Sequence, residues 1–295
     1  MKKAPNFNFL DHYTYFVPNV PDLLILFLWF VVGSVLGNVI SFIFLKVLGP
    51  EAGMEVGLVV AYPAMFIPPM IYASSRSRRN CLSRCGLKMD SSNFGVLGPG
   101  LCVLFVIVGT LCASYIADAV GALLPRMPER LKEIMESMVS GNLLLNLLCV
   151  SIFAPVFEEW LCRGMVLRGL LGNNVKPVWA IIISALFFAL IHLNPWQAIP
   201  AFLLGCLFGY VYYKTGSLKL TMLMHFTNNT FALFMSRIPA LKDMESWKDV
   251  LSAPAYYLIF ACCILIVVLI VLRFSKIENR SAQGNLDEVP SLFEQ

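Results

Sequence analysis

Residues 151–171 read SIFAPVFEEWLCRGMVLRGLL, an apolar stretch interrupted by Glu158, Glu159 and Arg163. The hydrophobic character extends over residues 142–170, which is long enough for one helix to cross a bilayer. A charged side chain at the centre of such a helix costs about 2.5–3.5 kcal/mol on insertion scales. These three charges are therefore tolerable only if they face other helices or a water-lined cavity.

The composition of the whole chain also predicts a membrane protein. Of 295 residues, 58% are hydrophobic and 14% are charged, against roughly 25% charged in a typical soluble domain. We expect an all-α polytopic bundle of about eight transmembrane helices around an internal polar cavity. The expected spans are residues 23–45, 56–73, 96–122, 142–170, 177–193, 197–213, 218–236 and 255–273.

The expected organisation is one transmembrane domain over residues 1–273, followed by a mobile cytoplasmic tail over 274–295. Residues 128–140 place apolar and charged side chains on opposite helical faces, which is typical of a helix lying on the membrane surface. Most of the 22 Lys and Arg residues fall on the side of the termini when loops are assigned by parity, Arg78, Arg163 and Arg168 among them. This excess predicts cytoplasmic termini. No basic tract is long enough to follow a nucleic-acid backbone, which argues against a nucleic-acid partner.

The two neighbouring glutamates have different surroundings within the sequence. Glu159 and Arg163 are four residues apart, so they share a helix face and are expected to form an ion pair that holds helices together. Glu158 points about 100° away from its neighbour and has no partner nearby in the sequence. A carboxyl group that loses its hydration in this way is suited to exchange a proton as a general base or acid. We therefore interpret Glu158 as a functional residue.

Two of the three histidines also lie in hydrophobic segments. His192 closes the expected fifth span, and His225 lies inside the seventh, with Asn229 one turn later on the same helix face. Together with Glu158 they suggest a single polar site within the membrane. In the expected sixth span, Gly205 and Gly209 have the GxxxG spacing of a close helix-packing face.

These residue types suit hydrolysis of a peptide bond. Glu158 and His192 would deprotonate the attacking water, while His225 and Asn229 would stabilise the oxyanion of the tetrahedral intermediate. This mechanism requires no cofactor. Zinc bound by Glu158, His192 and His225 is the alternative, although the HExxH motif is absent. Two non-hydrolytic alternatives also stay open: a transporter that relays protons through these residues, and a scaffold or immunity protein in which they only hold helices together.

The order of the three motifs resembles that of a known family. EEWLCR at 158–163 fits EExxxR, FALIH at 188–192 fits FxxxH, and HFTNN at 225–229 fits HxxxN. In this order within hydrophobic helices, they are similar to the motifs of the type II CAAX prenyl endopeptidases, the CPBP or Abi group of intramembrane proteases. The resemblance covers about residues 142–236.

The resemblance implies an eight-helix bundle with a cavity open to the cytoplasm and the membrane. By motif position it implies that Glu158 is the catalytic glutamate, Glu159 and Arg163 the second acid and the arginine, and His192, His225 and Asn229 the remaining site residues. The implied enzyme is a membrane endopeptidase, either glutamic-type or metal-dependent. Its substrate would be a membrane-associated peptide or lipidated protein, either a prenylated CAAX protein or a bacteriocin-type peptide. The similar bacterial members imply a bacterial inner membrane.

Overall fold

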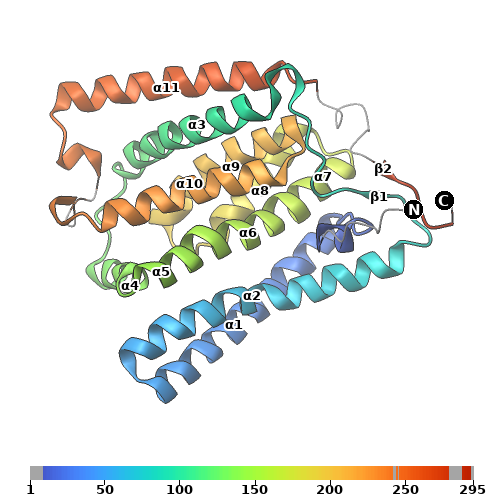
Figure 1. The fold of residues 1–295 in the computed structure, drawn as a ribbon, viewed down its shortest axis with the longest axis horizontal. Coiled ribbons are helices and arrows are strands. Elements are labelled where there is room, and N and C mark those ends of the chain that lie inside the picture. The colour runs from blue at the N-terminus through green and yellow to red at the C-terminus, as the bar shows by residue number, and fades with distance from the viewer. Residues whose placement is uncertain (1–8, 242–243, 245, 279–287, 294–295) are drawn as a thin grey trace, which may run out of the picture.

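The computed structural model describes residues 9–241, 244, 246–278 and 288–293, except the side chains of 138 and 139. Nearly all of the regular structure is helical (Figure 1). Helices α1 and α2 form a hairpin on one side of the molecule, and α3 and α11 lie on the other. Between them lie α6, α8, α9 and α10, and these helices and the segments that directly follow α6 and α8 carry the residues that the sequence singled out.

Helices α1 (Val20–Leu48) and α2 (Pro50–Asn80) are antiparallel and packed along their length. Asn19 begins α1 with a capping box, because its side chain accepts a hydrogen bond from the backbone of Asp22 and the Asp22 carboxylate accepts one in return. At Gly33 the two helices lie so close together that a Cβ would collide with the Met65 backbone. The hairpin therefore depends on a small residue in α1.

The segment from 143 to 172 is one continuous helical run, but it is not uniform. It consists of α5 (Leu143–Asn146), a π-helical segment η3 (Leu147–Phe153), α6 (Ala154–Glu159), a second π-helical segment η4 (Trp160–Leu167) and α7 (Arg168–Gly172). Every residue of η4 is buried. π-Helical turns are uncommon and are often found at functional sites. The short α6 segment between them carries both Glu158 and Glu159.

The remaining long helices each correspond to one expected span. They are α3 (Gly98–Gly121), α8 (Pro177–Leu190), α9 (Pro195–Thr215), α10 (Leu218–Ser236) and α11 (Ala253–Ser275). The helix expected over 128–140 is α4 (Glu129–Val139). Short 3-10 turns occur at η1 (Phe9–Tyr13), η2 (Gly95–Leu97), η5 (Pro239–Leu241) and η6 (Trp247–Asp249).

The polytopic all-α fold is confirmed, and each of the expected hydrophobic stretches overlaps a helical segment, while the count of eight spans stays a prediction. Five helical segments are long and apolar enough to cross a membrane: Val20–Leu48, Pro50–Asn80, Gly95–Gly121, Leu143–Gly172 and Ala253–Ser275. Helix α8 is apolar but has only 14 residues. Helices α9 and α10 are longer than α8 but contain more polar residues. The five long helices make this an integral membrane protein.

Two arginines that we counted as loop charges are buried instead. Arg163 and Arg168 are both fully inaccessible. The guanidinium group of Arg168 donates hydrogen bonds to backbone carbonyls of Gly164, Leu87, Tyr13 and Phe16. It therefore fastens the N-terminal segment and the loop after α2 to the central helical run, and neither arginine is a topological charge. A parity count cannot distinguish a solvated basic residue from one that carbonyl groups hold in the interior.

Part of the tail expected over residues 274–295 has regular structure. Helix α11 ends at Ser275, and residues 279–287 lie outside the described part of the chain. Beyond them, strand β2 (Glu288–Val289) pairs antiparallel with β1 (Gly86–Leu87). Tyr15 also donates a hydrogen bond from its hydroxyl group to the carbonyl of Pro290. Backbone pairing with a distant loop, which no sequence periodicity signals, places this segment beside the N-terminal part of the chain.

Candidate active site

Glu159 and Arg163 form the buried ion pair that their spacing predicts. The Arg163 Nη1 atom lies 2.7 Å from Glu159 Oε1, and both side chains are fully buried. The guanidinium carbon of Arg163 also lies 4.6 Å from the ring centroid of Phe188 and 5.4 Å from that of Phe208. Cation–π contacts of this kind are strengthened by the absence of water. Arg163 is therefore held by a carboxylate and by two aromatic faces.

The close packing predicted for Gly205 and Gly209 is present between α8 and α9. A Cβ at Gly205 would lie 3.2 Å from Ala185, and one at Gly209 would lie 3.2 Å from Ile181. The carbonyl of Gly205 accepts a hydrogen bond from Arg163 Nη2 at 2.9 Å. The small residue thus lets α9 come near enough to bind the arginine through its backbone.

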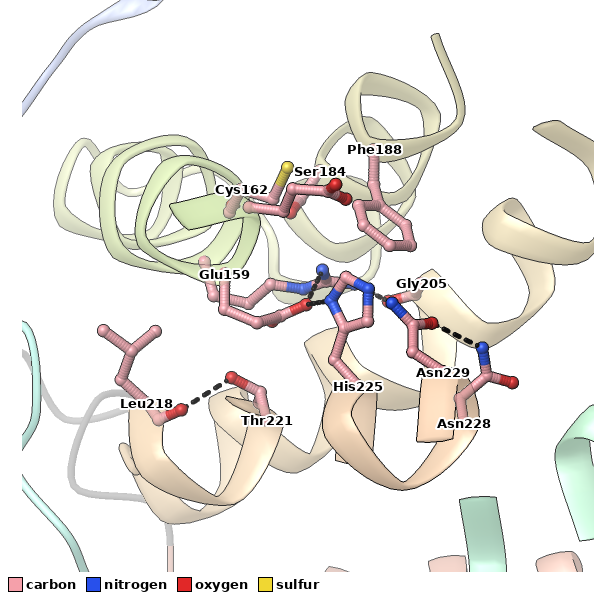
Figure 2. Close-up of polar contacts among 12 residues, drawn as sticks. Glu159, Cys162, Ser184, Phe188, Gly205, Leu218, Thr221, His225, Asn228 and Asn229 are labelled. Carbon is pink, nitrogen blue, oxygen red and sulfur yellow. Dashed lines mark hydrogen bonds and ion pairs between the residues drawn. The ribbon is translucent and has the colours of Figure 1, made fainter. Parts of the chain in front are cut away.

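His225 is bound to the second glutamate and not to the first. Its Nδ1 atom lies 3.1 Å from Glu159 Oε1, and the side chain is 4% exposed. Figure 2 shows the imidazole between Glu159 and the ring of Phe188, with Asn229 beside it on the same face of α10. Because an ionised carboxylate only accepts hydrogen bonds, Nδ1 must carry a proton and Nε2 is directed elsewhere. The shared face of His225 and Asn229 is the one that their spacing predicts.

His192 lies just beyond the helix that was expected to contain it. Helix α8 ends at Leu190, and the chain turns through Leu193, which has a φ of +58°. The Nδ1 atom of His192 lies 2.7 Å from the carbonyl oxygen of Phe188. That carbonyl is one of the groups left unpaired at the end of a helix, so the imidazole caps it by donation from Nδ1. The half-buried ring then has Nε2 as its unprotonated nitrogen in the neutral form.

The two histidines come together on one aromatic side chain. Their ring centroids lie 5.0 Å (His192) and 5.4 Å (His225) from the centroid of Phe188, both in edge-to-face geometry. Sequence reasoning noted Phe188 only as the first position of a motif. Its ring organises the site, since it contacts both imidazoles and the Arg163 guanidinium group.

Glu158 has a partner that the sequence did not reveal. The hydroxyl group of Tyr62, from α2, donates a hydrogen bond to Glu158 Oε1. Oε2 of the same carboxyl group is buried and has no hydrogen-bond partner among the described residues. A tyrosine inside an expected membrane span is the signal that could have been used, because a phenol in hydrocarbon needs a hydrogen-bond partner. Which partner it finds depends on how the α1–α2 hairpin packs against α6.

Asn229 links α10 to the first π-helical segment. Its Nδ2 atom donates to the carbonyl of Val150 at 2.9 Å, and its Oδ1 atom accepts from Asn228 at 3.0 Å (Figure 2). Asn228 in turn accepts a hydrogen bond from Ser114 of α3 at 2.7 Å. A side-chain amide has two N–H groups, so one remains on Asn229 after the bond to Val150.

The six predicted residues are thus brought together by three helical segments, α6, η4 and α10, and by the turn after α8, but not as one continuous network. Glu159, Arg163 and His225 are joined directly, whereas no hydrogen bond among the described residues joins Glu158 to either histidine. The expected pairing of Glu158 with His192 would need a bridging water. The described residues contain no group of three His, Cys, Asp or Glu side chains placed to hold a metal ion. The zinc alternative stays a prediction: Glu158 Oε2 has no partner among the described residues, and both histidines are bound through Nδ1, which leaves each Nε2 available.

The fold and the site define a class of protein: a helical integral membrane protein that buries an arginine, two carboxylates and an imidazole between its helices. Residues 140–231 match the family model described as type II CAAX prenyl endopeptidase Rce1-like. The resemblance drawn from the three motifs is therefore confirmed over this part of the chain, which is similar to the type II CAAX prenyl endopeptidases. The matched segment contains all six predicted residues and excludes α1–α3 and α11. No curated protein and no solved structure gives a significant match to the chain.

Proposed function

We propose that this protein is an intramembrane endopeptidase that hydrolyses a peptide bond in a membrane-associated substrate with a water activated by Glu158. The observation that carries the proposal is the state of that carboxyl group: Oε1 is held by Tyr62, while the buried Oε2 has no hydrogen-bond partner among the described residues. An oriented carboxylate with one unengaged oxygen is the arrangement that a general base needs in order to bind and deprotonate water.

His192 is the proposed second group that binds the attacking water. Its Nδ1 atom is occupied by the Phe188 carbonyl, so the neutral imidazole offers the lone pair of Nε2. In the proposed mechanism the water lies between Glu158 Oε2 and this nitrogen. The carboxylate takes the proton as the water oxygen attacks the peptide carbonyl, and the same proton passes to the leaving amine when the tetrahedral intermediate collapses.

His225 and Asn229 are the proposed oxyanion donors. An imidazole whose Nδ1–H donates to Glu159 has an Nε2–H only in its doubly protonated form. With both glutamates ionised and Arg163 positive, a protonated His225 brings the buried group to neutrality, which lowers the cost of burying its charges. The remaining amide N–H of Asn229 is the second donor. Glu159 and Arg163 then position His225 without contacting the substrate.

Tyr62 gives a prediction specific to this site. Tyr62→Phe keeps the ring but removes the hydroxyl group that orients Glu158, so we expect kcat to fall about tenfold with KM within twofold. The matched control is Tyr72→Phe, ten residues later in α2, which loses a similar hydrogen bond to the carboxylate of Asp22. Steady-state cleavage by the two purified variants tests this prediction. An equal fall in kcat in both variants would show that Tyr62 has no specific role in catalysis.

The proposed mechanism requires no metal ion. We expect full cleavage activity after exhaustive treatment with a strong chelator in metal-free buffer, with no change on adding Zn²⁺ back. Metal analysis of the same sample should accompany the assay. If chelation abolished activity and stoichiometric Zn²⁺ restored it, a metal ion and not the carboxylate alone would activate the water.

The substrate is best identified in cells. Relatives in the matched family act on CAAX proteins, and the alternative is a bacteriocin-type peptide. Quantitative mass spectrometry of membrane-associated C-termini, in cells producing wild-type or Glu158→Gln protein, is the experiment that tests activity and substrate together. The expected result is a set of trimmed C-termini present only with the wild type. Identical C-termini in both would favour the transporter or scaffold alternatives.

A further inference from the structure

An open groove runs along the end of α2, outside the site described above. Its volume is about 640 Å³, within the range of known ligand sites. One wall is a single face of α2, and the other is the N-terminal turn η1. The lining residues are Phe9, Tyr13, Ile67, Met70, Ile71, Ser74, Ser75, Arg78 and Arg79.

The α2 wall changes in polarity along the helix axis. Ile67 and Ile71 are exposed apolar side chains, Ser74 and Ser75 follow one turn later, and the arginines follow after one more turn. With a rise of 1.5 Å per residue, the first isoleucine and Arg78 are roughly 16 Å apart. Helix α2 is one of the candidate membrane spans. The groove therefore leads from the hydrocarbon region to the polar surface, in the order apolar, hydroxyl, cationic.

The two arginines at the mouth of the groove carry uncompensated charge. Arg78 and Arg79 are exposed, and neither forms an ion pair with a carboxylate among the described residues. Arg76, on another face of the same helix, lies 3.5 Å from Asp22. The guanidinium groups facing the groove are thus free to bind an anion, and guanidinium is well suited to bidentate binding of phosphate.

The two η1 residues that line the groove, Phe9 and Tyr13, are aromatic, and the acid of that turn, Asp11, is not among the lining residues. Phe9 is 51% exposed, and its ring lies 5.6 Å from that of Tyr13 in edge-to-face contact. Burial raises the pKa of Tyr13 to about 12, so its phenol is neutral at physiological pH. The electrostatics of the groove are therefore set by the two arginines.

We propose that this groove binds one anionic phospholipid, with the phosphate at Arg78 and Arg79, the glycerol ester region beside Ser74 and Ser75, and an acyl chain against Ile67. The ligand must combine a negative head with an apolar chain, because the cationic and apolar parts of the groove are continuous. Headgroup charge distinguishes this ligand from the zwitterionic lipid that surrounds any membrane protein. The proposal is independent of the hydrolytic function.

Native mass spectrometry of the full-length protein in detergent tests this binding. The probes are dioleoyl phosphatidylglycerol, phosphatidylcholine with the same chains, and glycerol 3-phosphate, which has the head but no chain. We expect the wild type to bind one phosphatidylglycerol at least about fivefold more tightly than phosphatidylcholine. The double variant Arg78→Gln/Arg79→Gln should lose that preference. Ile67→Ala/Ile71→Ala should weaken phosphatidylglycerol binding, because it shortens the apolar wall.

The matched control removes two positive charges elsewhere. Arg273 and Lys276 are exposed at the end of α11, so Arg273→Gln/Lys276→Gln has the same change in net charge and should keep the preference. If this control lost the preference for phosphatidylglycerol as fully as the groove variant, the effect would be one of general charge. If the wild type bound phosphatidylcholine as tightly as phosphatidylglycerol, the groove would not require an anionic headgroup. Displacement of phosphatidylglycerol by glycerol 3-phosphate at equal concentration would reveal a phosphate site without a lipid chain. Each of these results overturns the proposal.

Discussion

Glu158→Gln is expected to lower kcat by at least about 100-fold while the fold survives. The amide oxygen can still accept the hydrogen bond from Tyr62, so the side chain should keep its place. The amide cannot take a proton from water, however, and general base catalysis is worth about 10²–10⁴ in rate. The measurement is steady-state cleavage of a membrane-adjacent peptide by purified wild type and variant in the same detergent or bilayer.

The control for this substitution is Asp118→Asn, which neutralises another acid inside a candidate membrane span. The carboxylate of Asp118 accepts hydrogen bonds from the Ser246 hydroxyl and the Trp247 backbone, which gives it a structural role at the other side of the bundle. We expect this variant to retain activity within about threefold. If Glu158→Gln cleaved as fast as Asp118→Asn, the carboxyl group of residue 158 could not be the base.

Breaking the buried ion pair is expected to have the largest effect on stability. Arg163→Met leaves Glu159 charged in the interior with only His225 beside it, and removing one partner of a buried pair costs about 3–5 kcal/mol. The double variant Glu159→Gln/Arg163→Met removes both charges and should recover much of that loss. It should still be inactive, since His225 loses the carboxylate that orients it. The free energy of unfolding of each variant, measured in mixed micelles, tests these expectations.

A surface ion pair provides the comparison. Lys219 lies 3.1 Å from Asp90, but its side chain is 77% exposed. Asp90 is 7% exposed, but its carboxylate also accepts a hydrogen bond from the backbone of Leu218. Because Lys219 is solvated, we expect Lys219→Met to cost about 0–1 kcal/mol, as at exposed pairs. An Arg163→Met protein as stable as Lys219→Met would contradict the burial of the pair. A stable but inactive double variant would instead separate the positioning role of Glu159 and Arg163 from their role in the fold.

The sequence was sufficient for the side-chain relations that helical pitch sets within one segment. Hydrophobic length located all the long helices, because crossing a bilayer requires a minimum run of apolar residues. Spacing predicted the Glu159–Arg163 pair, the shared face of His225 and Asn229, and the packing surface at Gly205, because the pitch of a helix fixes which side chains are neighbours. Three short motifs were sufficient to recognise the family, which the match over residues 140–231 confirms.

Relations between helices were decided only by the tertiary structure. The sequence left Glu158 without a partner, and the packing of α2 against α6 supplies Tyr62. His225 was expected to share a site with Glu158, His192 and Asn229, and its hydrogen bond to Glu159 of another helical segment was not predicted. Arg168 was predicted to be a loop charge, but its guanidinium group donates hydrogen bonds to four backbone carbonyls. Part of the expected tail forms strand β2. These contacts join residues far apart in the chain. Their existence depends on how helices turn and approach one another, which no local periodicity encodes.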